Sequence, residues 1–176
     1  MKRIILAVVT FILTHLFASA QERIVLRMDD FVKVYIDAYK DDCFCQLLPL
    51  SKLTSDLSYN AIILEKRNNR FKLMITLSDI LCDIESEPII GWVDTNDCGV
   101  FLLCNNYDGS VPLLNLYESP TLESYVDIID ISSIIGLWIS ITDIHKGFVK
   151  VSFEIQGNTY RGWISRYCTD PYNSCT

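Results

Sequence analysis

The sequence has few of the residues that several functional classes require. It carries 15 Lys and Arg against 22 Asp and Glu, for a net charge of −7, whereas a nucleic-acid binder needs clustered basic side chains. Nucleic acid is therefore excluded as a partner. Seven glycines and five prolines in 176 residues leave no collagen-like or low-complexity segment. Half of the residues are hydrophobic and 21% are charged, so the chain can bury a core and intrinsic disorder is excluded.

Histidine is especially scarce, with copies only at positions 15 and 145. A Ser-His-Asp or Cys-His site would have to use His145, which lies in the polar segment 143–147 and is predicted to be a solvated turn residue. HExxH and a glycine-rich phosphate loop are absent, and Cys43-Phe44-Cys45 is C-x-C rather than a zinc-type C-x-x-C. Residues 94–99 begin like a calcium loop but lack its later ligands. We therefore expect no metal, no cofactor and no catalytic residue, and hence a protein that is not an enzyme.

The first 20 residues are typical of a cleaved signal peptide. Lys2 and Arg3 precede the apolar run 4–17, and residues 18–20 read Ala-Ser-Ala, the small-x-small pattern of a cleavage site. The apolar run is shorter than the roughly 20 residues that span a bilayer. The cleavage point also lacks the cysteine that a bacterial lipoprotein carries there, so a lipoprotein is not expected. Cleavage leaves 13 basic and 22 acidic residues, a net charge of −9. The predicted location is secreted or periplasmic.

A second apolar stretch, 126–144, contains Asp127, Asp130 and Asp143. A charged side chain near a bilayer centre costs about 3 kcal/mol, so this stretch is predicted to form strands, and no membrane insertion of the mature chain is expected.

Apolar and polar residues alternate strictly over 149–155, which predicts a half-buried strand. The Gln-Gly-Asn turn at 156–158 and a second short strand over 159–164 complete a hairpin. Similar runs predict strands over 24–28, 31–36, 61–64, 71–77, 113–117 and 138–142. Only 47–57 suggests a turn or two of helix. The chain is therefore predicted to be mostly β.

Part of the sequence repeats itself. Gly91-Trp92-Val93 recurs 71 positions later as Gly162-Trp163-Ile164, and Asp83-Ile84 recurs as Glu154-Ile155. On that register, residues 80, 82 and 84 match residues 151, 153 and 155. Val34-Tyr35 corresponds to Leu116-Tyr117 at an offset of 82, so the first copy is about 11 residues longer between its Tyr and its Trp. We expect two homologous modules, 21–107 and 108–176; the alternative is a single β-sandwich.

These motifs resemble the bacterial SH3-like (SH3b) domain. Residues 114–120 are similar to its first strand and long loop, 147–151 to its central strand, and 160–164 to its closing strand. The first copy keeps Val34-Tyr35 and Gly91-Trp92-Val93 but carries the insertion. The resemblance implies two small, strongly bent β-barrels in tandem, each used as a binding or targeting module, of the kind that often accompanies cell-wall hydrolases in exported bacterial proteins.

Seven cysteines fit an oxidising compartment. Cys168 and Cys175 enclose turn-forming residues and are predicted to form a short disulfide. Cys98 and Cys104 enclose a strand-like segment, so one or both are expected to pair with Cys43 or Cys45, although a local bond between them stays open. Cys82 matches Phe153 on an inward face and is predicted to be a buried free thiol.

Aromatic side chains are the remaining candidates for a binding site. A groove lined by rings could hold a peptide or glycan through flat apolar contact, and Tyr117, Tyr125, Tyr35 and Trp138 are its predicted residues. Trp92 and Trp163 are predicted to fill the core, because small barrels are filled by side chains.

The function predicted from these features is that of an exported, non-catalytic binding or targeting module that recognises a peptide, a cell-envelope polymer or a partner protein. One alternative is a carboxylate-dependent hydrolase of cell wall or glycan, which would need two facing carboxylates. Another is a structural or inhibitory protein-interaction partner.

Overall fold

The protein is mostly β, as predicted. The computed structural model describes residues 22–27, 30–49, 52, 57–79, 84–102, 112–134, 137–165 and 167–169, and α-helix is absent from these residues. Nothing in this part of the chain is a helix of the length and apolarity that a membrane crossing requires. The predicted signal peptide and the predicted break between modules near residues 105–110 lie outside the described residues.

The strands are β1 (Arg23–Leu26), β2 (Val32–Tyr35), β3 (Phe44–Leu47), β4 (Leu57–Arg67), β5 (Arg70–Asp79), β6 (Ile84–Glu85), β7 (Ile89–Asp94), β8 (Cys98–Leu102), β9 (Leu113–Tyr117), β10 (Tyr125–Asp130), β11 (Trp138–His145), β12 (Phe148–Ile155), β13 (Asn158–Ile164) and β14 (Tyr167–Cys168). Two short 3-10 turns, η2 (Thr95–Asp97) and η3 (Leu122–Ser124), lie between strands. The helical turn expected over 47–57 falls mostly outside the described residues; its two end residues belong to β3 and β4.

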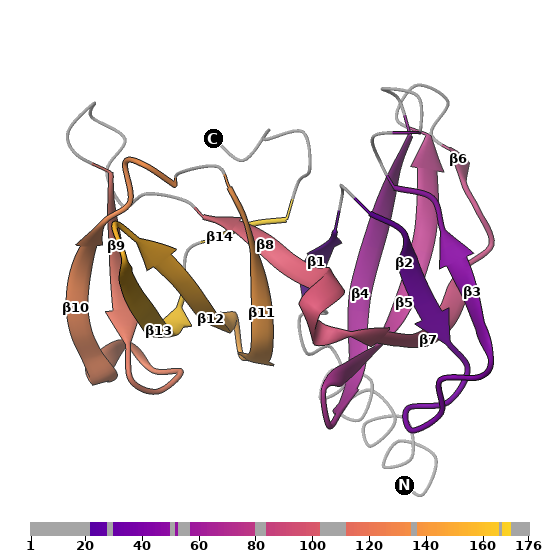
Figure 1. Ribbon diagram of the computed structural model, residues 1–176, viewed down its shortest axis with the longest axis horizontal. Helices are drawn as coiled ribbons and strands as arrows, with labels where there is room; N and C mark the ends of the chain where they lie inside the picture. The colour runs from indigo at the N-terminus through magenta and orange to yellow at the C-terminus, as the bar shows by residue number, and fades with distance from the viewer. Residues whose placement is uncertain are drawn as a thin grey trace, which may run out of the picture.

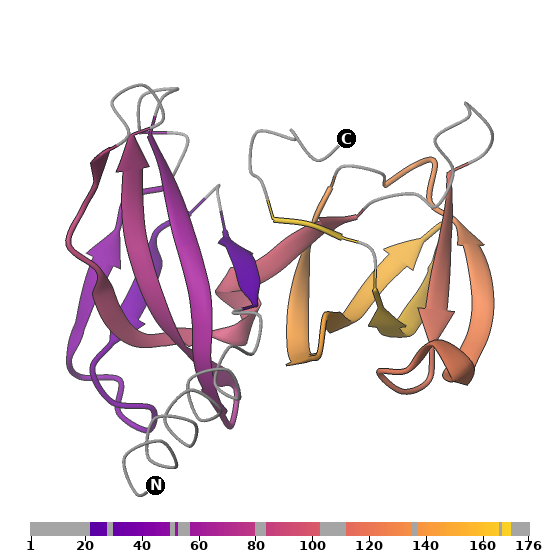
Figure 2. The ribbon, with the colours of Figure 1, turned by 180° about the vertical axis from the view of Figure 1, so that it is seen from behind.

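All the strands belong to one antiparallel sheet with the order β10-β9-β13-β12-β11-β8-β1-β4-β5-β7-β2-β3, while β14 pairs with β8 and β6 with β5. The order reads the same from either end when β1 is matched with β8, β2 with β9, β3 with β10, β4 with β11, β5 with β12 and β7 with β13. Figures 1 and 2 show the corresponding two halves side by side, joined through β1, β8 and β11.

The repeated residues occupy matching places in the two halves. Trp92 of β7 lies opposite Lys72 on one side and Tyr35 on the other. In the second half, Trp163 of β13 lies opposite Lys150 and Tyr117 in the same manner. The lysine ammonium group lies 5.9 Å from the tryptophan ring centroid in both halves. The two Tyr and two Trp residues singled out in the sequence therefore mark the same register.

The match of the middle strands predicted from the sequence is wrong. Lys72 and Lys150 are the partners of the two tryptophans, so β5 corresponds to β12 at an offset of 78 rather than 71. A bulge at the same place supports this offset, because the register shifts between residues 63 and 65 in β4 and between residues 141 and 143 in β11. The Gly-Trp strands keep the offset of 71. A single offset therefore cannot align the whole repeat.

This register locates the longer segment of the first half. Tyr35 and Lys72 are 37 positions apart, against 33 for Tyr117 and Lys150. The distance from lysine to tryptophan is 20 positions in the first half and 13 in the second. Most of the extra residues thus lie between β5 and β7, where the second half has a two-residue turn with Gly157 at a φ of 81°.

The glycine of each Gly-Trp motif allows two strands to cross closely. A Cβ atom on Gly162 would lie 2.7 Å from the Leu116 side chain and 2.8 Å from the Tyr117 carbonyl oxygen. On Gly91 it would lie 2.4 Å from Val34 Cγ1. Only glycine fits such contacts without a shift of the neighbouring strand.

β8 belongs to both halves. Gly99 pairs with Val25 of β1 on one side and with Ser140 of β11 on the other. Farther along β8, Leu102 pairs with Tyr167 of β14. The main cluster of buried side chains is likewise continuous and contains residues from both halves, with Val100 and Leu102 of β8 fully buried within it. A boundary between residues 107 and 108 therefore assigns β8 to the first module, although β11 and β14 of the second half pair with it.

Candidate functional site

A cleft lies where the two halves meet. β14 and β1 follow each other along the same side of β8: Cys168 pairs with Phe101, and Val25 pairs with Gly99. Val100 lies between these two pairs, so the end of β14 and the start of β1 approach it from opposite directions along β8. Junctions between structural units are common places for ligand sites. Residues at the start of β1 and in β14, such as Arg23 and Tyr167, line a cleft at this junction.

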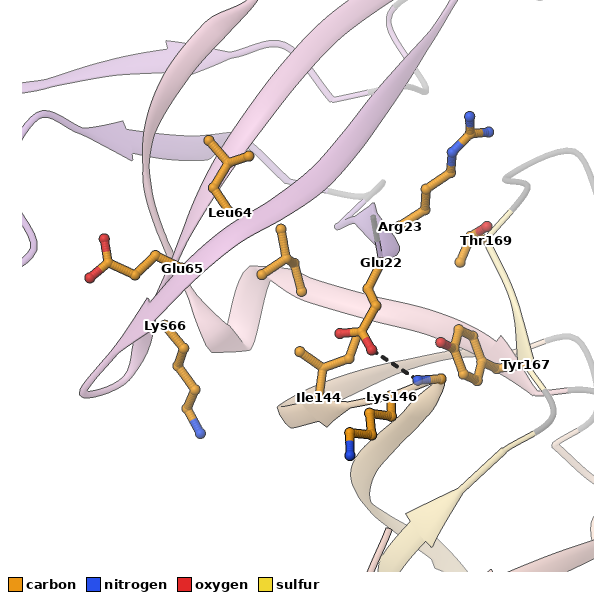
Figure 3. A pocket seen from close by; sticks show the side chains of 11 residues that line it. Glu22, Arg23, Leu64, Glu65, Lys66, Ile144, Lys146, Tyr167 and Thr169 are labelled. Carbon is orange, nitrogen blue, oxygen red and sulfur yellow. Dashed lines mark hydrogen bonds between the residues drawn. The ribbon is translucent and has the colours of Figure 1, made fainter. Parts of the chain in front are cut away.

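The cleft has a volume of about 830 Å³. Aliphatic and aromatic side chains from β4, β11 and β14 form its apolar part, and charged side chains from β1, β4 and the β11–β12 turn surround them (Figure 3). Its lining includes Glu22, Leu64, Glu65, Ile144, Lys146 and Tyr167. Leu64 is 44% exposed, more than the other apolar residues that line the cleft.

Polar contacts across the cleft hold the halves together. Glu22 Oε1 accepts a hydrogen bond from the Gly147 backbone N–H at 2.9 Å (Figure 3). Lys66 of β4 forms an ion pair with Asp143 of β11 at 2.8 Å. Burial first, and then the nearby Glu22 carboxylate, raises the pKa of Tyr167 to about 12. The Tyr167 hydroxyl is therefore a neutral hydrogen-bonding group at physiological pH.

The two carboxylates of the cleft do not form a facing pair. Glu22 points toward Gly147, whereas Glu65 is directed away from it (Figure 3). Glu65 Oε1 instead accepts a hydrogen bond from Arg67 Nε at 2.5 Å. Glycosidase chemistry needs two carboxyl groups that face each other across the scissile bond, whereas Glu22 and Glu65 point in different directions.

Two of the predicted groove residues are buried. Tyr35 is 7% exposed and Tyr117 5%, so little of either ring is accessible, and their assignment to a binding groove stays a prediction. Each ring packs on the strand beside it: Tyr35 lies 5.7 Å from the Phe44 ring and Tyr117 lies 6.3 Å from the Tyr125 ring. Arg70 lies over the Tyr35 ring, and Phe148 packs edge-on against the Tyr117 ring.

The other two predicted groove residues lie apart. Trp138 is half-buried where the halves join: its indole N–H donates to the Val25 carbonyl oxygen at 3.3 Å, and its ring lies over Gly99. This tryptophan fastens β11 to β1 across β8. Tyr125, on β10, is 49% exposed and is the most exposed of the four groove candidates. No single groove brings the four residues together.

Trp92 and Trp163 are buried, at 6% and 9% exposure, but they do not fill the main core. Val93, the neighbour of Trp92, points into that core, so Trp92 points to the opposite face of β7. There it forms a separate small cluster with Tyr35 and Ala38. Both tryptophans are thus buried outside the main cluster, and their structural role stays a prediction.

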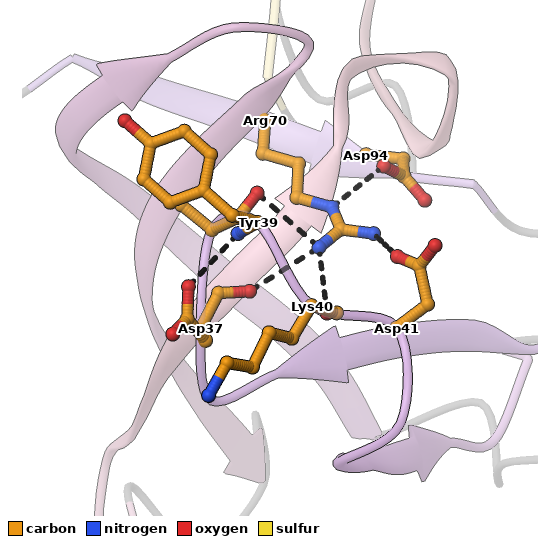
Figure 4. A network of polar contacts seen from close by, with 7 residues as sticks. Asp37, Tyr39, Lys40, Asp41, Arg70 and Asp94 are labelled. Carbon is orange, nitrogen blue, oxygen red and sulfur yellow. Dashed lines mark hydrogen bonds and ion pairs between the residues drawn. The ribbon is translucent and has the colours of Figure 1, made fainter.

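Sequence reasoning missed a buried arginine at the start of β5. Arg70 is 8% exposed, and its guanidinium carbon lies 3.7 Å from the Tyr35 ring centroid. Arg70 Nε donates to Asp94 Oδ1 at 2.9 Å, and Nη2 donates to Asp41 (Figure 4). Nη1 donates to the carbonyl oxygens of Asp37, Ala38 and Lys40 at 3.2, 3.4 and 3.0 Å. Arg70 thereby fixes the loop between β2 and β3.

The cysteines only partly follow the predictions. Cys43, Cys45 and Cys98 are free thiols, so the expected bridge from Cys98 to Cys43 or Cys45 is absent. The reason is topological: five strands separate β8 from β3 along the sheet, and Cys98 is buried while the other two are exposed. Cys168 is buried in β14. Cys82, Cys104 and Cys175 lie outside the described residues, so the Cys168–Cys175 bond and the free Cys82 stay predictions.

His145 ends β11 and is exposed beside the Lys146-Gly147 turn, as the sequence predicted. Across the described residues, no three His, Cys, Asp or Glu side chains lie together in a way that could hold a metal ion. Comparison with family models, with curated proteins and with solved structures gave no match. Inferences about function therefore depend on the strand arrangement and on the chemistry of the surface.

Proposed function

We propose that this chain is an exported, non-catalytic binding protein built from two SH3-like modules that share β8. The support is the repeat of strand order, bulge position and Tyr-Lys-Trp register in the two halves, together with the sequence resemblance to bacterial SH3-like domains.

The ligand we propose is a short extended peptide, from a partner protein or from the peptide part of a cell-envelope polymer, held in the cleft between the halves. The observation that carries this proposal is the chemistry of the 830 Å³ cleft: an apolar surface from Leu64 and Ile144 bordered by both carboxylates and ammonium groups. A peptide offers aliphatic side chains and both charges in one ligand. The neutral Tyr167 hydroxyl can donate to a peptide carbonyl.

The test is a binding measurement with a panel of short blocked peptides and soluble peptidoglycan fragments, read by calorimetry. Leu64→Trp should fill the cleft and weaken binding at least about tenfold, because a filled pocket cannot desolvate a ligand side chain. Leu48→Trp is the matched control, since Leu48 is 50% exposed and lies outside the cleft. Binding that is unaffected by Leu64→Trp, or equally weakened by both variants, would contradict the proposal.

The hydrolase alternative has its own experiment. Peptidoglycan and generic glycans incubated with the mature chain should release no new reducing ends or amines, because the cleft holds no facing carboxylate pair. A turnover that Glu22→Gln or Glu65→Gln abolishes would establish the hydrolase and overturn the non-catalytic assignment.

A further inference from the structure

Within the part of the chain that the structure describes, the sheet ends at β10, which pairs with β9 on one side only. A free sheet edge presents unpaired N–H and C=O groups and is a template for another strand. Along β10 the backbone N–H of Ile128 donates to Asp127 Oδ1 at 2.8 Å. A carboxylate that caps its neighbour's N–H makes a local bond, which an incoming strand can replace.

β10 presents apolar surface at this edge. Tyr125, Val126 and Ile128 are 49%, 57% and 48% exposed, and Leu122 just before the strand is 69% exposed. Consecutive exposed apolar residues on an edge strand mark an interaction site or an aggregation hazard. Two exposed carboxylates, Asp127 and Asp130, interrupt this surface and oppose unspecific pairing.

A pocket of about 270 Å³ lies directly beside β10. Its polar lining consists of carboxylates, hydroxyls and amides from Asp127, Asp130, Ser132, Ser133, Gln156 and Asn158, and no basic side chain lines it. Asp130 Oδ1 accepts hydrogen bonds from the Ser132 backbone N–H at 2.9 Å and from its hydroxyl at 2.5 Å. These two bonds lower the pKa of Asp130, so its carboxylate stays ionised.

We propose that β10 adds an extended, basic segment of another protein as a new strand, with a Lys or Arg side chain of that segment in the Asp127–Asp130 pocket. The edge supplies main-chain hydrogen bonds, the exposed apolar side chains of β10 supply packing, and the two carboxylates select a cationic side chain. This surface is separate from the cleft, so the proposal does not depend on the ligand proposed there.

The charges of the edge favour a basic partner over a second copy of the chain. Pairing β10 with β10 would bring Asp127 and Asp130 of both copies to one short strand pair, and like charges on neighbouring strands are destabilising. The mature chain also has nine more acidic than basic residues. A basic segment offsets this charge, whereas an identical chain adds to it.

The experiment uses the mature chain and a short blocked peptide of alternating lysine and valine, with a glutamate–valine peptide for comparison. Calorimetry should detect binding of the lysine peptide only. Asp127→Lys should weaken that binding at least about tenfold, while Glu87→Lys, the same charge change at an exposed site of the first half, should change it less than about twofold. Hydrogen exchange should show slower exchange of the β10 amides when the lysine peptide is bound.

A second pair of variants tests the backbone pairing. Ile128→Pro removes the N–H that Asp127 caps and should abolish binding, whereas Gln46→Pro changes the corresponding position of β3 and should leave it intact; circular dichroism checks that both are folded. If Ile128→Pro does not fold, the hydrogen-exchange result decides. Equal losses with Asp127→Lys and Glu87→Lys, or β10 amides that exchange unchanged, would overturn the proposal. A chain that self-associates through β10 in sedimentation would also overturn it.

Discussion

The two halves share the same strand order and register, but one matching position holds a charged residue in the first half and an aromatic residue in the second. Arg70 and Phe148 each lie two residues before the lysine that pairs with tryptophan. Arg70 stacks its guanidinium on Tyr35, while Phe148 packs its ring edge-on against Tyr117 at 5.5 Å. The frame therefore requires that the tyrosine be covered, and it accepts either a hydrogen-bonded cation or an aromatic ring as the cover.

The loops explain which cover each half uses. In the first half, Arg70 binds three loop carbonyl groups and two carboxylates and so organises residues 37–41. In the second half, Ser124 does this work, since its hydroxyl donates to the Ser119 carbonyl at 2.6 Å and accepts from the Ser119 N–H at 3.1 Å. Because Ser124 holds loop 118–124 in place, the residue at the position of Arg70 is not needed for that purpose and can be the aromatic Phe148.

The largest expected effect concerns the strand that the halves share. A segment of residues 109–176 should fail to fold, because without β8 both β11 and β14 lose a strand partner. A segment of residues 96–176 retains β8 and should give a β-type circular dichroism spectrum with a cooperative thermal transition. If 109–176 folds as well as 96–176, the second half is independent of β8 and the shared-strand description fails.

The next effect compares the two close-approach glycines. Gly162→Ala should destabilise the chain by about 2 to 3 kcal/mol, because the new Cβ meets the Tyr117 carbonyl oxygen. Gly91→Ala should cost less, because its closest neighbour is a side-chain atom of Val34 and the backbone oxygen of Tyr35 lies at 3.0 Å. Urea unfolding measures both free energies. Gly157→Ala, with open space at its Cβ but a φ of 81°, separates backbone strain from clash.

A third prediction concerns the side chain that covers each of the two tyrosines, which is replaced by methionine in one half at a time. Arg70→Met should destabilise the chain by about 2 kcal/mol, through the loss of hydrogen bonds made by a buried charged group. Hydrogen exchange of loop residues 37–41 should accelerate. Phe148→Met should cost less and leave loop 118–124 unchanged, because Ser124 still fastens that loop. Equal acceleration of hydrogen exchange in both loops would contradict this, because it would show that Ser124 does not hold loop 118–124 in place when Phe148 is replaced.

Sequence reasoning predicted much of the frame and little of the surface. Alternation identified β12 and β13, and the Gly-Trp and apolar-Tyr motifs marked the register, because these residues obey local rules of pleat and close approach. The match of residues 80, 82 and 84 with β12 was wrong, since the connection between β5 and β7 is longer than the turn between β12 and β13 and the Gly-Trp motif does not encode its length. The cleft and the role of Arg70 depend on side chains brought together from distant segments, which periodicity cannot show.

The smallest expected effect concerns a titratable pair at matching positions. Cys98 of β8 pairs with Leu26 of β1, and Tyr167 of β14 pairs with Leu102 of β8. Among the described residues, β8 is the last strand of the first half and β14 is the last strand of the second. Burial raises the pKa of both groups, well above the usual value for the Cys98 thiol and to about 12 for Tyr167. The closing position of each half thus favours a neutral side chain.

A pH titration of stability tests this for Tyr167. An unfolded tyrosine ionises near pH 10, while folded Tyr167 keeps its proton to about pH 12. Between these values the unfolded state binds fewer protons than the folded state, so the free energy of unfolding should fall as the pH rises. Tyr167→Phe should reduce that slope in urea titrations, and Tyr125→Phe, at an exposed ring outside the cleft, should retain it. Superposed curves for wild type and Tyr167→Phe would mean that Tyr167 ionises alike in both states, and that its hydroxyl lies in water rather than in a dry cleft.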